Sequence, residues 1–292
     1  MTWYSGLEHI VREGESLSSL TQLRIGGPAE FFAEPTSVDE LAELINRCNS
    51  EQITLRILGG GSRVLVSDEG VKGLVVQLSA PAFCEINVEN EFVTAGGGAK
   101  LGHLVSTAVR EGMGGLESLV GIPGTVAGAL KGNSDSNGTS IGQWVESVTV
   151  MNRQAELETI EKDQLIFSYR RTNLDAPVIL SAKLRLEKRD VDELTRRLQK
   201  IWIIKRSQQP SNELGHGRAF ADAQGMGAAE LVDQSGMRHH KVGQAEVWER
   251  NPNYVIANPG TTSSDVKNLI DSIQSKVEQE LGIQLERELQ IW

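Results

Sequence analysis

The sequence predicts a soluble α+β protein built from two or three lobes. Its 292 residues exceed the usual domain size of about 100–150 residues. Short strand-like apolar runs and amphipathic helix patterns both occur along the chain, which is typical of this fold class. The composition shifts at Glu187-Lys-Arg-Asp190, and we expect the main domain boundary there, with residues 18–187 before it and 188–292 after it.

Composition excludes several classes of protein. Hydrophobic residues make up 39% of the chain, and no apolar run approaches the roughly 20 residues that a membrane span needs. The first residues lack the basic start and apolar stretch of a secretory signal, so we expect a cytoplasmic protein. The formal net charge of −10 argues against nucleic-acid binding, which needs clustered Lys and Arg. Cys48 and Cys84 form at most one disulfide, and no metal site is expected.

The first part of the chain begins with a helix followed by strands. Ser37-Val-Asp-Glu40 is a capping-box pattern, and the apolar residues that follow it have helical spacing, which predicts a helix over 37–48. Residues 53–58 and 73–78 are apolar runs on either side of a glycine turn. They predict two strands and a β-α-β start.

A second sheet is expected further along. Residues 85–95 have the pattern of paired strands, and 101–111 predict a helix closed by Gly112, since glycine is preferred at left-handed helix ends. Apolar residues in 145–186 come in short β-type runs. These runs predict the second sheet.

The C-terminal part reads as a separate α+β lobe. Residues 191–208 predict one long helix, and a last helix after Ser264 should stop at Gly282. In residues 283–291, apolar and polar residues alternate, so we expect a half-buried strand there.

Two glycine-rich turns stand out in the sequence: Leu58-Gly-Gly-Gly-Ser-Arg63 and Gly121-Ile-Pro-Gly-Thr-Val-Ala-Gly128. Neither has the spacing of a dinucleotide fingerprint or a P-loop. Consecutive glycines can still expose backbone N–H groups that bind an anion. Each turn alone is most simply a tight turn, but Arg24-Ile-Gly-Gly-Pro-Ala29 and Thr94-Ala-Gly-Gly-Gly98 add to the pattern. Together the four segments indicate a phosphate site.

The order and spacing of these motifs resemble the UDP-N-acetylenolpyruvoylglucosamine reductase family. The resemblance continues through Phe167-Ser-Tyr-Arg170 and Gln209-Pro210 to Leu285-Glu-Arg-Glu-Leu289, so it covers nearly the whole chain. The chain lacks the insert loop of the longer subclass and has a short C-terminus. It is therefore similar to the shorter subclass.

The resemblance implies a fold and two cofactors. It predicts an FAD-binding vanillyl-alcohol-oxidase/PCMH-type fold of two subdomains, followed by a C-terminal α+β substrate lobe. The cofactors implied are FAD and NADPH. We expect the flavin to be held without a covalent link, because the glycine turns imply backbone contacts to phosphate and no matched His or Cys is positioned for flavin attachment. The residues assigned to cofactor binding on this basis are Arg24, Gly26, Gly27, Gly59, Gly60, Gly61, Ser62, Gly97, Gly121, Ile122, Gly124, Thr125 and Gly128.

The family's reaction requires a cation near developing negative charge. These enzymes reduce the enolpyruvyl double bond of a UDP-sugar with hydride from NADPH, carried by FAD, and the transition state has enolate character. Such charge is stabilised by preorganised donors. Arg170 matches the family's catalytic arginine and Glu288 its catalytic glutamate. From the residues alone, Arg170 could be a surface arginine at a strand end, and Glu288 could lie on the solvent-exposed face of a strand.

Several positions depart from the family pattern. The family's proton-donating serine aligns with Arg218, which is assigned to the catalytic set but cannot readily act as a general acid because guanidinium keeps its proton. The lysine and asparagine that help hold the nucleotide align with Ala221 and Asp222. Further departures occur at Arg63, in Asn133-Ser-Asp-Ser-Asn-Gly138 and in Trp248-Glu-Arg-Asn-Pro-Asn-Tyr254.

The missing serine leaves the proton donor open. His216 lies two positions before Arg218 and has a suitable ordinary pKa near 6.5, but it could equally be a surface histidine. An ordered water beside Arg218 is the donor we favour. The adjacent pair His239-His240 lies between Arg238 and Lys241, which favours a solvated basic patch.

The function expected is reduction of UDP-N-acetylglucosamine enolpyruvate to UDP-N-acetylmuramate in peptidoglycan synthesis. We expect a cytoplasmic monomer whose partner is this UDP-sugar, with no nucleic acid and no membrane involved. The departures leave two other readings open. One is a related flavoprotein with another substrate, such as a flavin oxidase, and the other is a non-catalytic FAD-binding protein.

Overall fold

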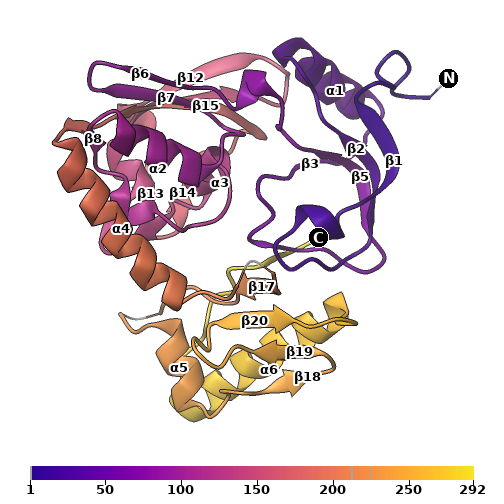
Figure 1. Ribbon diagram of the computed structural model, residues 1–292. Helices are drawn as coiled ribbons and strands as arrows, with labels where there is room; N and C mark the ends of the chain where they lie inside the picture. The colour runs from indigo at the N-terminus through magenta and orange to yellow at the C-terminus, as the bar shows by residue number, and fades with distance from the viewer. Residues whose placement is uncertain (1, 212, 224) are drawn as a thin grey trace. The chain divides into compact units, whose positions relative to one another are not determined.

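The computed structural model describes residues 2–211, 213–223 and 225–292. Two compact units make up the chain, and each combines segments that are separated in the sequence (Figure 1). Unit 1 comprises Met1–Glu13, Phe31–Gly60 and Lys72–Lys205, and unit 2 comprises Gly14–Glu30, Gly61–Val71 and Arg206–Trp292. The functional boundary expected between residues 187 and 188 remains a prediction.

The larger sheet of unit 1 is antiparallel, with five strands in the order β12-β11-β15-β7-β6. Val93, Val148 and Ala182 from this sheet share one core with the buried faces of two helices. The predicted paired strands in 85–95 and the predicted second sheet are confirmed. The elements are β6 Ile86–Glu89, β7 Phe92–Gly96, β11 Val145–Met151, β12 Leu157–Glu161, β15 Val178–Arg185, α2 Leu101–Arg110 and α3 Val126–Lys131.

A smaller sheet has the strand order β1-β2-β5-β3. Helix α1 (Val38–Ser50) starts where expected, because the Ser37 side chain accepts a hydrogen bond from the Glu40 amide. Its buried residues, among them Leu41 and Leu44, share a core with Leu74 of β5. The predicted helix and the two strands after it are confirmed. The strand bounds are β1 Val11–Ser16, β2 Pro28–Ala33, β3 Leu55–Ile57 and β5 Val71–Val76.

Short hairpins and one long helix complete unit 1. Helix α2 ends before Gly112, which has the left-handed φ of +70° that the sequence predicts. Helix α4 (Val191–Ser207) confirms the long helix expected over 191–208. The remaining short strands are β8 Met113–Gly114, β9 Asp135–Ser136, β10 Thr139–Ser140, β13 Phe167–Ser168, β14 Arg171–Thr172 and β16 Glu187–Lys188.

Unit 2 contains a four-stranded antiparallel sheet, in the order β17-β20-β19-β18, helices α5 and α6, and the separate strand pair β21-β4. The last helix, α6, begins after a Thr262 capping box and ends at Gly282, whose φ is +68°. Its apolar face, including Val266 and Ile273, forms a core with the sheet. The elements are β4 Val64–Leu65, β17 Gly215–Arg218, β18 Lys241–Val242, β19 Ala245–Val247, β20 Tyr254–Ala257, α5 Ala228–Gln234, α6 Ser263–Leu281 and β21 Gln290–Ile291.

The strand expected over 283–291 is mostly wrong. Only β21 (Gln290–Ile291) is a strand, and it pairs in parallel with β4. Leu285 and Leu289 are buried as the alternation requires, but Ile291 is 46% exposed. Within the described residues, the segment before β21 has one isolated bridge, between Arg287 and Phe220. The alternation here therefore reflects packing on the unit 2 core rather than a strand ladder.

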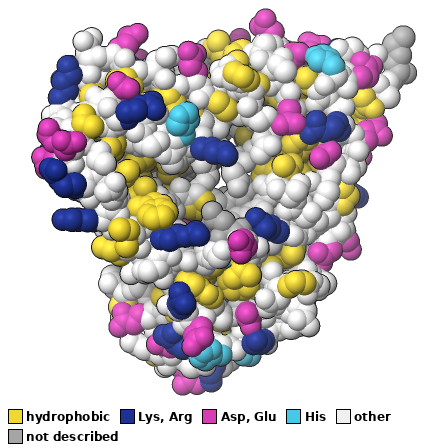
Figure 2. Space-filling model, in the orientation of Figure 1, with side chains coloured by type: hydrophobic (Ala, Val, Ile, Leu, Met, Phe, Trp, Pro, Cys, Tyr) yellow, Lys and Arg dark blue, Asp and Glu magenta, His cyan; other side chains and the backbone are white. Residues whose placement is uncertain are grey.

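Charged side chains of both signs are interspersed over the face shown in Figure 2. Apolar side chains are also visible there. The exposed apolar residues of the protein include Trp202 and Ile203 of α4. Within the described residues, none of the helices combines the length and the apolar composition that a membrane crossing requires.

Candidate functional site

Two of the glycine turns lie against each other within unit 1. A Cβ atom added at Gly60 would lie 2.6 Å from the Cα of Gly124, and one added at Gly59 would lie 2.8 Å from the Thr125 hydroxyl oxygen. Backbone at such distances cannot accommodate a side chain, so glycine is required at Gly60 for the turns to meet. The two glycine-rich turns singled out in the sequence therefore contact each other in the folded protein.

The juxtaposed turns present backbone donors suited to an anion. Among the described residues, the amides of Gly59, Gly60, Gly124 and Thr125 donate to no protein acceptor. Backbone N–H groups of this kind bind phosphate oxygens well, because no side chain stands in the way. The donor set therefore fits the diphosphate of a dinucleotide cofactor.

Other residues assigned to cofactor binding use their amides inside the protein. The Gly97 amide donates to Leu180, that of Ile122 donates to Leu119, and that of Gly128 donates to the Thr125 hydroxyl. Gly121 has a φ of +77° and supports the turn conformation. These residues shape the loops, and only their remaining surface is available to a ligand.

The remaining predicted cofactor residues belong to unit 2. Cβ atoms at Gly26, Gly27 and Gly61 would lie within 2.5 Å of the carbonyl oxygens of Val66, Asp68 and Leu20, respectively. These glycines therefore let segments of unit 2 approach closely. Arg24 has a left-handed φ of 56° and donates to the Glu213 carbonyl, and Ser62 follows Gly61 in the same loop.

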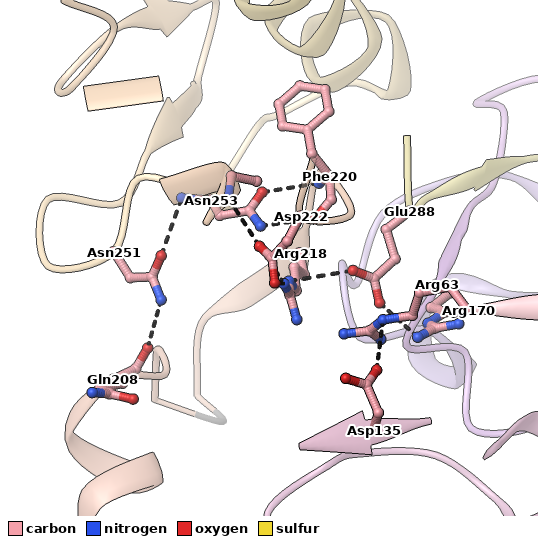
Figure 3. A network of polar contacts seen from close by, with 11 residues as sticks. Arg63, Asp135, Arg170, Gln208, Arg218, Phe220, Asp222, Asn251, Asn253 and Glu288 are labelled. Atoms are coloured by element: carbon pink, nitrogen blue, oxygen red, sulfur yellow. Dashed lines mark hydrogen bonds and ion pairs between the residues drawn. The ribbon is translucent and has the colours of Figure 1, made fainter. Parts of the chain in front are cut away.

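Arg170 occupies a tight hairpin between β13 and β14, where Ser168 pairs with Arg171. Its φ is +58°, and its side chain is only 15% exposed and forms an ion pair with Asp135, with Nε 2.9 Å from Oδ1 (Figure 3). Both residues line a pocket of about 430 Å³ in unit 1. The exposed-arginine interpretation is therefore wrong, since Arg170 is a mostly buried residue in a pocket wall.

Glu288 is the centre of an ion network in unit 2 (Figure 3). Its side chain is 8% exposed, with Oε1 2.7 Å from Arg63 and Oε2 3.3 Å from Arg218. Arg218 also lies 3.1 Å from Asp222. Glu288 is therefore not on the solvent-exposed face of a strand, whereas the nearby Glu286 is exposed. Arg63 was noted in the sequence only as a departure, because its partner is far away along the chain.

Comparison with known proteins gives two family matches. A model described as FAD binding domain matches residues 29–161, and one described as the C-terminal domain of UDP-N-acetylenolpyruvoylglucosamine reductase matches 209–292. A UDP-N-acetylenolpyruvoylglucosamine reductase of Rhodopirellula baltica is 39% identical over 98% of this chain and 94% of its own length. The chain belongs to the UDP-N-acetylenolpyruvoylglucosamine reductase family.

Other reductases of the family are also similar to this chain over nearly its whole length. The Moorella thermoacetica protein is 34% identical over 99% of this chain and 95% of its own. The crystal structure of the Thermus caldophilus reductase matches with a TM-score of 0.82 and 29% identity, over 97% of this chain and 99% of that one. The predicted PCMH-type FAD-binding fold with a C-terminal domain, and the shorter subclass, are confirmed.

Arg218, where the reductase family's serine was expected, retains its proton. Burial lowers the pKa of Arg218, but the carboxylates of Glu288 and Asp222 outweigh this effect, so that its pKa lies above the ordinary arginine value. Asp222 also accepts a hydrogen bond from the Ala228 amide at the start of α5. Both departures thus belong to an internal polar network.

His216 is a structural residue, so the expectation of a surface histidine is wrong. It is 3% exposed. Its Nδ1 lies 2.8 Å from the Leu214 carbonyl and therefore carries the proton it donates, while Nε2 contacts the Gln22 side-chain amide. Burial lowers the pKa of His216, although the bond to Leu214 opposes the shift. With both ring nitrogens engaged, it is poorly placed to donate a proton to a ligand.

The buried His216 predicts a pH-dependent stability. Because its folded-state pKa lies below the ordinary value of about 6.5, its stabilising contribution is present above that pH and is lost as the pH falls. We expect the free energy of unfolding, measured by urea titration, to decrease between about pH 7 and pH 5. His216→Gln should reduce this dependence, whereas His103→Gln, on the exposed side of α2, should not. Equal effects of the two changes would contradict the assignment.

Asn253 is a positioning residue that sequence reasoning missed. It is 3% exposed, accepts a hydrogen bond from the Phe220 amide and donates one to the Phe220 carbonyl. These bonds fix the segment between Arg218 and Asp222. The only available signal was the short segment Trp248-Glu-Arg-Asn-Pro-Asn-Tyr254, which was noted for its differences from the family.

Proposed function

We propose that this chain is an FAD- and NADPH-dependent reductase that converts UDP-N-acetylglucosamine enolpyruvate to UDP-N-acetylmuramate for peptidoglycan synthesis. We further propose that it acts in the cytoplasm as a monomer. The observation that carries the proposal is Arg170, which lines a polar pocket in a chain similar to these reductases over nearly its whole length. The related reductases supply the reaction type, and the site residues support it.

FAD, when bound, supplies the hydride acceptor for NADPH and the hydride donor for the double bond. The diphosphate of FAD would be held by backbone amides that donate to no protein acceptor among the described residues, those of Gly59, Gly60, Gly124 and Thr125. Because the two turns require glycine to meet, their amides are preorganised for this contact. Gly97 and Gly128 support the turn that contains Gly124, since the Ala127 amide donates to the Gly97 carbonyl and the Gly128 amide donates to the Thr125 hydroxyl.

Arg170 is proposed to stabilise the negative charge that develops when hydride adds to the terminal carbon of the double bond, because the charge on the neighbouring carbon is delocalised onto the substrate carboxylate. A guanidinium provides several donors in a plane and remains charged at ordinary pH. Glu288 is proposed to orient Arg63 and Arg218, since it holds one with each carboxylate oxygen. The proton needed at the carbanion is assigned to water, because Arg218 holds its own proton and the nitrogens of His216 are engaged.

Anaerobic stopped-flow absorbance of the purified flavoprotein tests this function. NADPH should bleach the flavin, and adding the enolpyruvyl substrate to the reduced protein should restore its colour. Bleaching without recovery would refute the reductase assignment. Rapid recovery with oxygen, combined with reduction by a hydroxy acid or sugar, would indicate a flavin oxidase.

Flavin should be bound without a covalent link. Acid precipitation should release FAD into the supernatant, because the site consists of backbone donors. Gly60→Ala should lower the FAD content severely, since its Cβ would meet the Gly124 backbone. Gly102→Ala is the matched control, because a Cβ there meets no atom within 4 Å. FAD that stays with the precipitate, or full loading of Gly60→Ala, would contradict the prediction.

A further inference from the structure

Asp135 forms a shielded ion pair with Arg170. The contacting atoms, Oδ1 of Asp135 and Nε of Arg170, lie 2.9 Å apart, and both are buried from solvent. Asp135 is in the β9–β10 hairpin, where it pairs with Ser140. Since the contact is removed from water, the attraction is stronger than that of an exposed surface pair.

The two loops that carry this pair are held together by a buried amide. Asn133 is 5% exposed. Its side chain donates to the Ser168 carbonyl at 2.8 Å and accepts from the Gly142 amide at 3.1 Å. The backbone around Asp135 is thereby tied to the hairpin of Arg170, so the position of the carboxylate against the guanidinium is fixed by the fold.

Asp135 also determines the charge of the pocket. Of the described residues that line the pocket of about 430 Å³, Arg170 and Asp135 are the two with charged side chains, and the others include the polar residues Asn133, Ser140 and Gln143. The two charges cancel. An anionic ligand attracted to Arg170 therefore meets the repulsion of a carboxylate already in contact with the same group.

A second cation is also influenced by Asp135. Lys205 donates through Nζ to the Ser118 carbonyl at 2.6 Å, and the 3₁₀ turn that contains Ser118 packs beside β9. Burial lowers the pKa of Lys205 to about 8, and the Asp135 carboxylate opposes this shift. The charge of Asp135 thus acts on Lys205 as well as on Arg170, its ion-pair partner.

We propose that Asp135 is a positioning residue that holds Arg170 in the pocket wall and, through its charge, weakens binding of the anionic substrate. The inference rests on the proposed reductase function, because it takes Arg170 as the group that meets the substrate carboxylate. Asp135 therefore has two separable effects. Its oxygen orients the guanidinium, and its charge competes with the substrate.

Two variants separate these effects. Asp135→Asn keeps an oxygen acceptor for Arg170 but removes the charge, so the dissociation constant of the enolpyruvyl substrate should fall about tenfold, while flavin reoxidation stays within about threefold of the parent. Asp135→Ala removes both, so binding should also tighten but reoxidation should slow by about 10- to 100-fold. Calorimetric titration of the oxidised holoprotein gives the binding constant without turnover, and anaerobic stopped-flow gives the reoxidation rate.

Glu146→Gln is the matched control. Glu146 belongs to unit 1, pairs with Lys162 and has a side chain 25% exposed, against 29% for Asp135. The Glu146→Gln substitution removes the same charge outside the pocket lining, so it should leave the dissociation constant and the reoxidation rate unchanged. Tightening by Glu146→Gln equal to that by Asp135→Asn would show a general charge effect and overturn the proposal.

Measurements on the parent protein separate a failure of the Asp135 proposal from a failure of the proposed reductase function. If the parent binds the substrate and reoxidises normally while both Asp135 variants match it, the role of Asp135 is refuted and the reductase function stands. If the holoprotein neither binds the substrate nor is reoxidised by it, the reductase function fails and the role of Asp135 falls with it.

Discussion

Arg170→Ala should slow reoxidation of the reduced flavin by the enolpyruvyl substrate about 10²- to 10³-fold, the usual cost of losing one well-placed electrostatic donor. Reduction by NADPH should be nearly unchanged, because that half-reaction develops no enolate. Arg170→Lys should retain part of the rate, since it keeps a charge but loses the planar guanidinium held by Asp135. Stopped-flow absorbance measures each half-reaction separately.

Arg171→Ala is the control for this prediction. Arg171 is the next residue of the same hairpin, and its side chain is exposed. It should leave both half-reactions near the parent rate. If Arg170→Ala instead slowed both half-reactions equally, the hairpin would be supporting the flavin site, and Arg170 would not be the group that stabilises the enolate.

Glu288→Gln should destabilise the protein and slow reoxidation together. The substitution keeps the side-chain shape but leaves Arg63 and Arg218 beside a neutral amide, in place of a carboxylate that is 8% exposed. Removing one partner of a largely buried ion pair typically costs about 3 kcal/mol of unfolding free energy. We expect a loss of that size in urea titration and, since Arg63 and Arg218 lose their orientation, about 10²-fold slower reoxidation.

Glu286→Gln separates this effect from a general loss of negative charge. Glu286 lies two residues earlier in the same segment, and its side chain is exposed. It should change stability by less than about 0.5 kcal/mol. If Glu288→Gln changed the unfolding free energy as little as Glu286→Gln, the ion network would contribute little to stability. Glu288 would then lose its proposed role.

Local patterns in the sequence were sufficient to predict many of the helices and strands of the fold. The Ser37 cap, the Gly112 and Gly282 helix ends and the paired strands in 85–95 all depend on neighbours within a few residues. The strand expected over 283–291 failed because alternating burial there comes from contact with the unit 2 core, and only β21 finds a partner strand.

The site was less accessible to sequence reasoning. Family resemblance selected Arg170 and Glu288, but not the charges that surround them. Asp135 and Arg63 were visible only as departures, since their partners lie in other segments of the chain. The burial of His216 depends on Gln22, a residue from a distant part of the same unit. Such pairings arise only when the chain has folded.

The division of unit 2 among three stretches of sequence has a consequence for the order of folding. Its early stretches, Gly14–Glu30 and Gly61–Val71, share a unit with Arg206–Trp292, and Val64 of β4 pairs with Gln290 of β21. During synthesis, β4 must wait for β21 to leave the ribosome, whereas the β1-β2-β5-β3 sheet and the five-stranded sheet of unit 1 can assemble sooner. Contacts between such distant residues form slowly. The nascent chain therefore carries β4 without its partner strand through most of its translation, a period in which chaperone capture or aggregation competes with completion of unit 2.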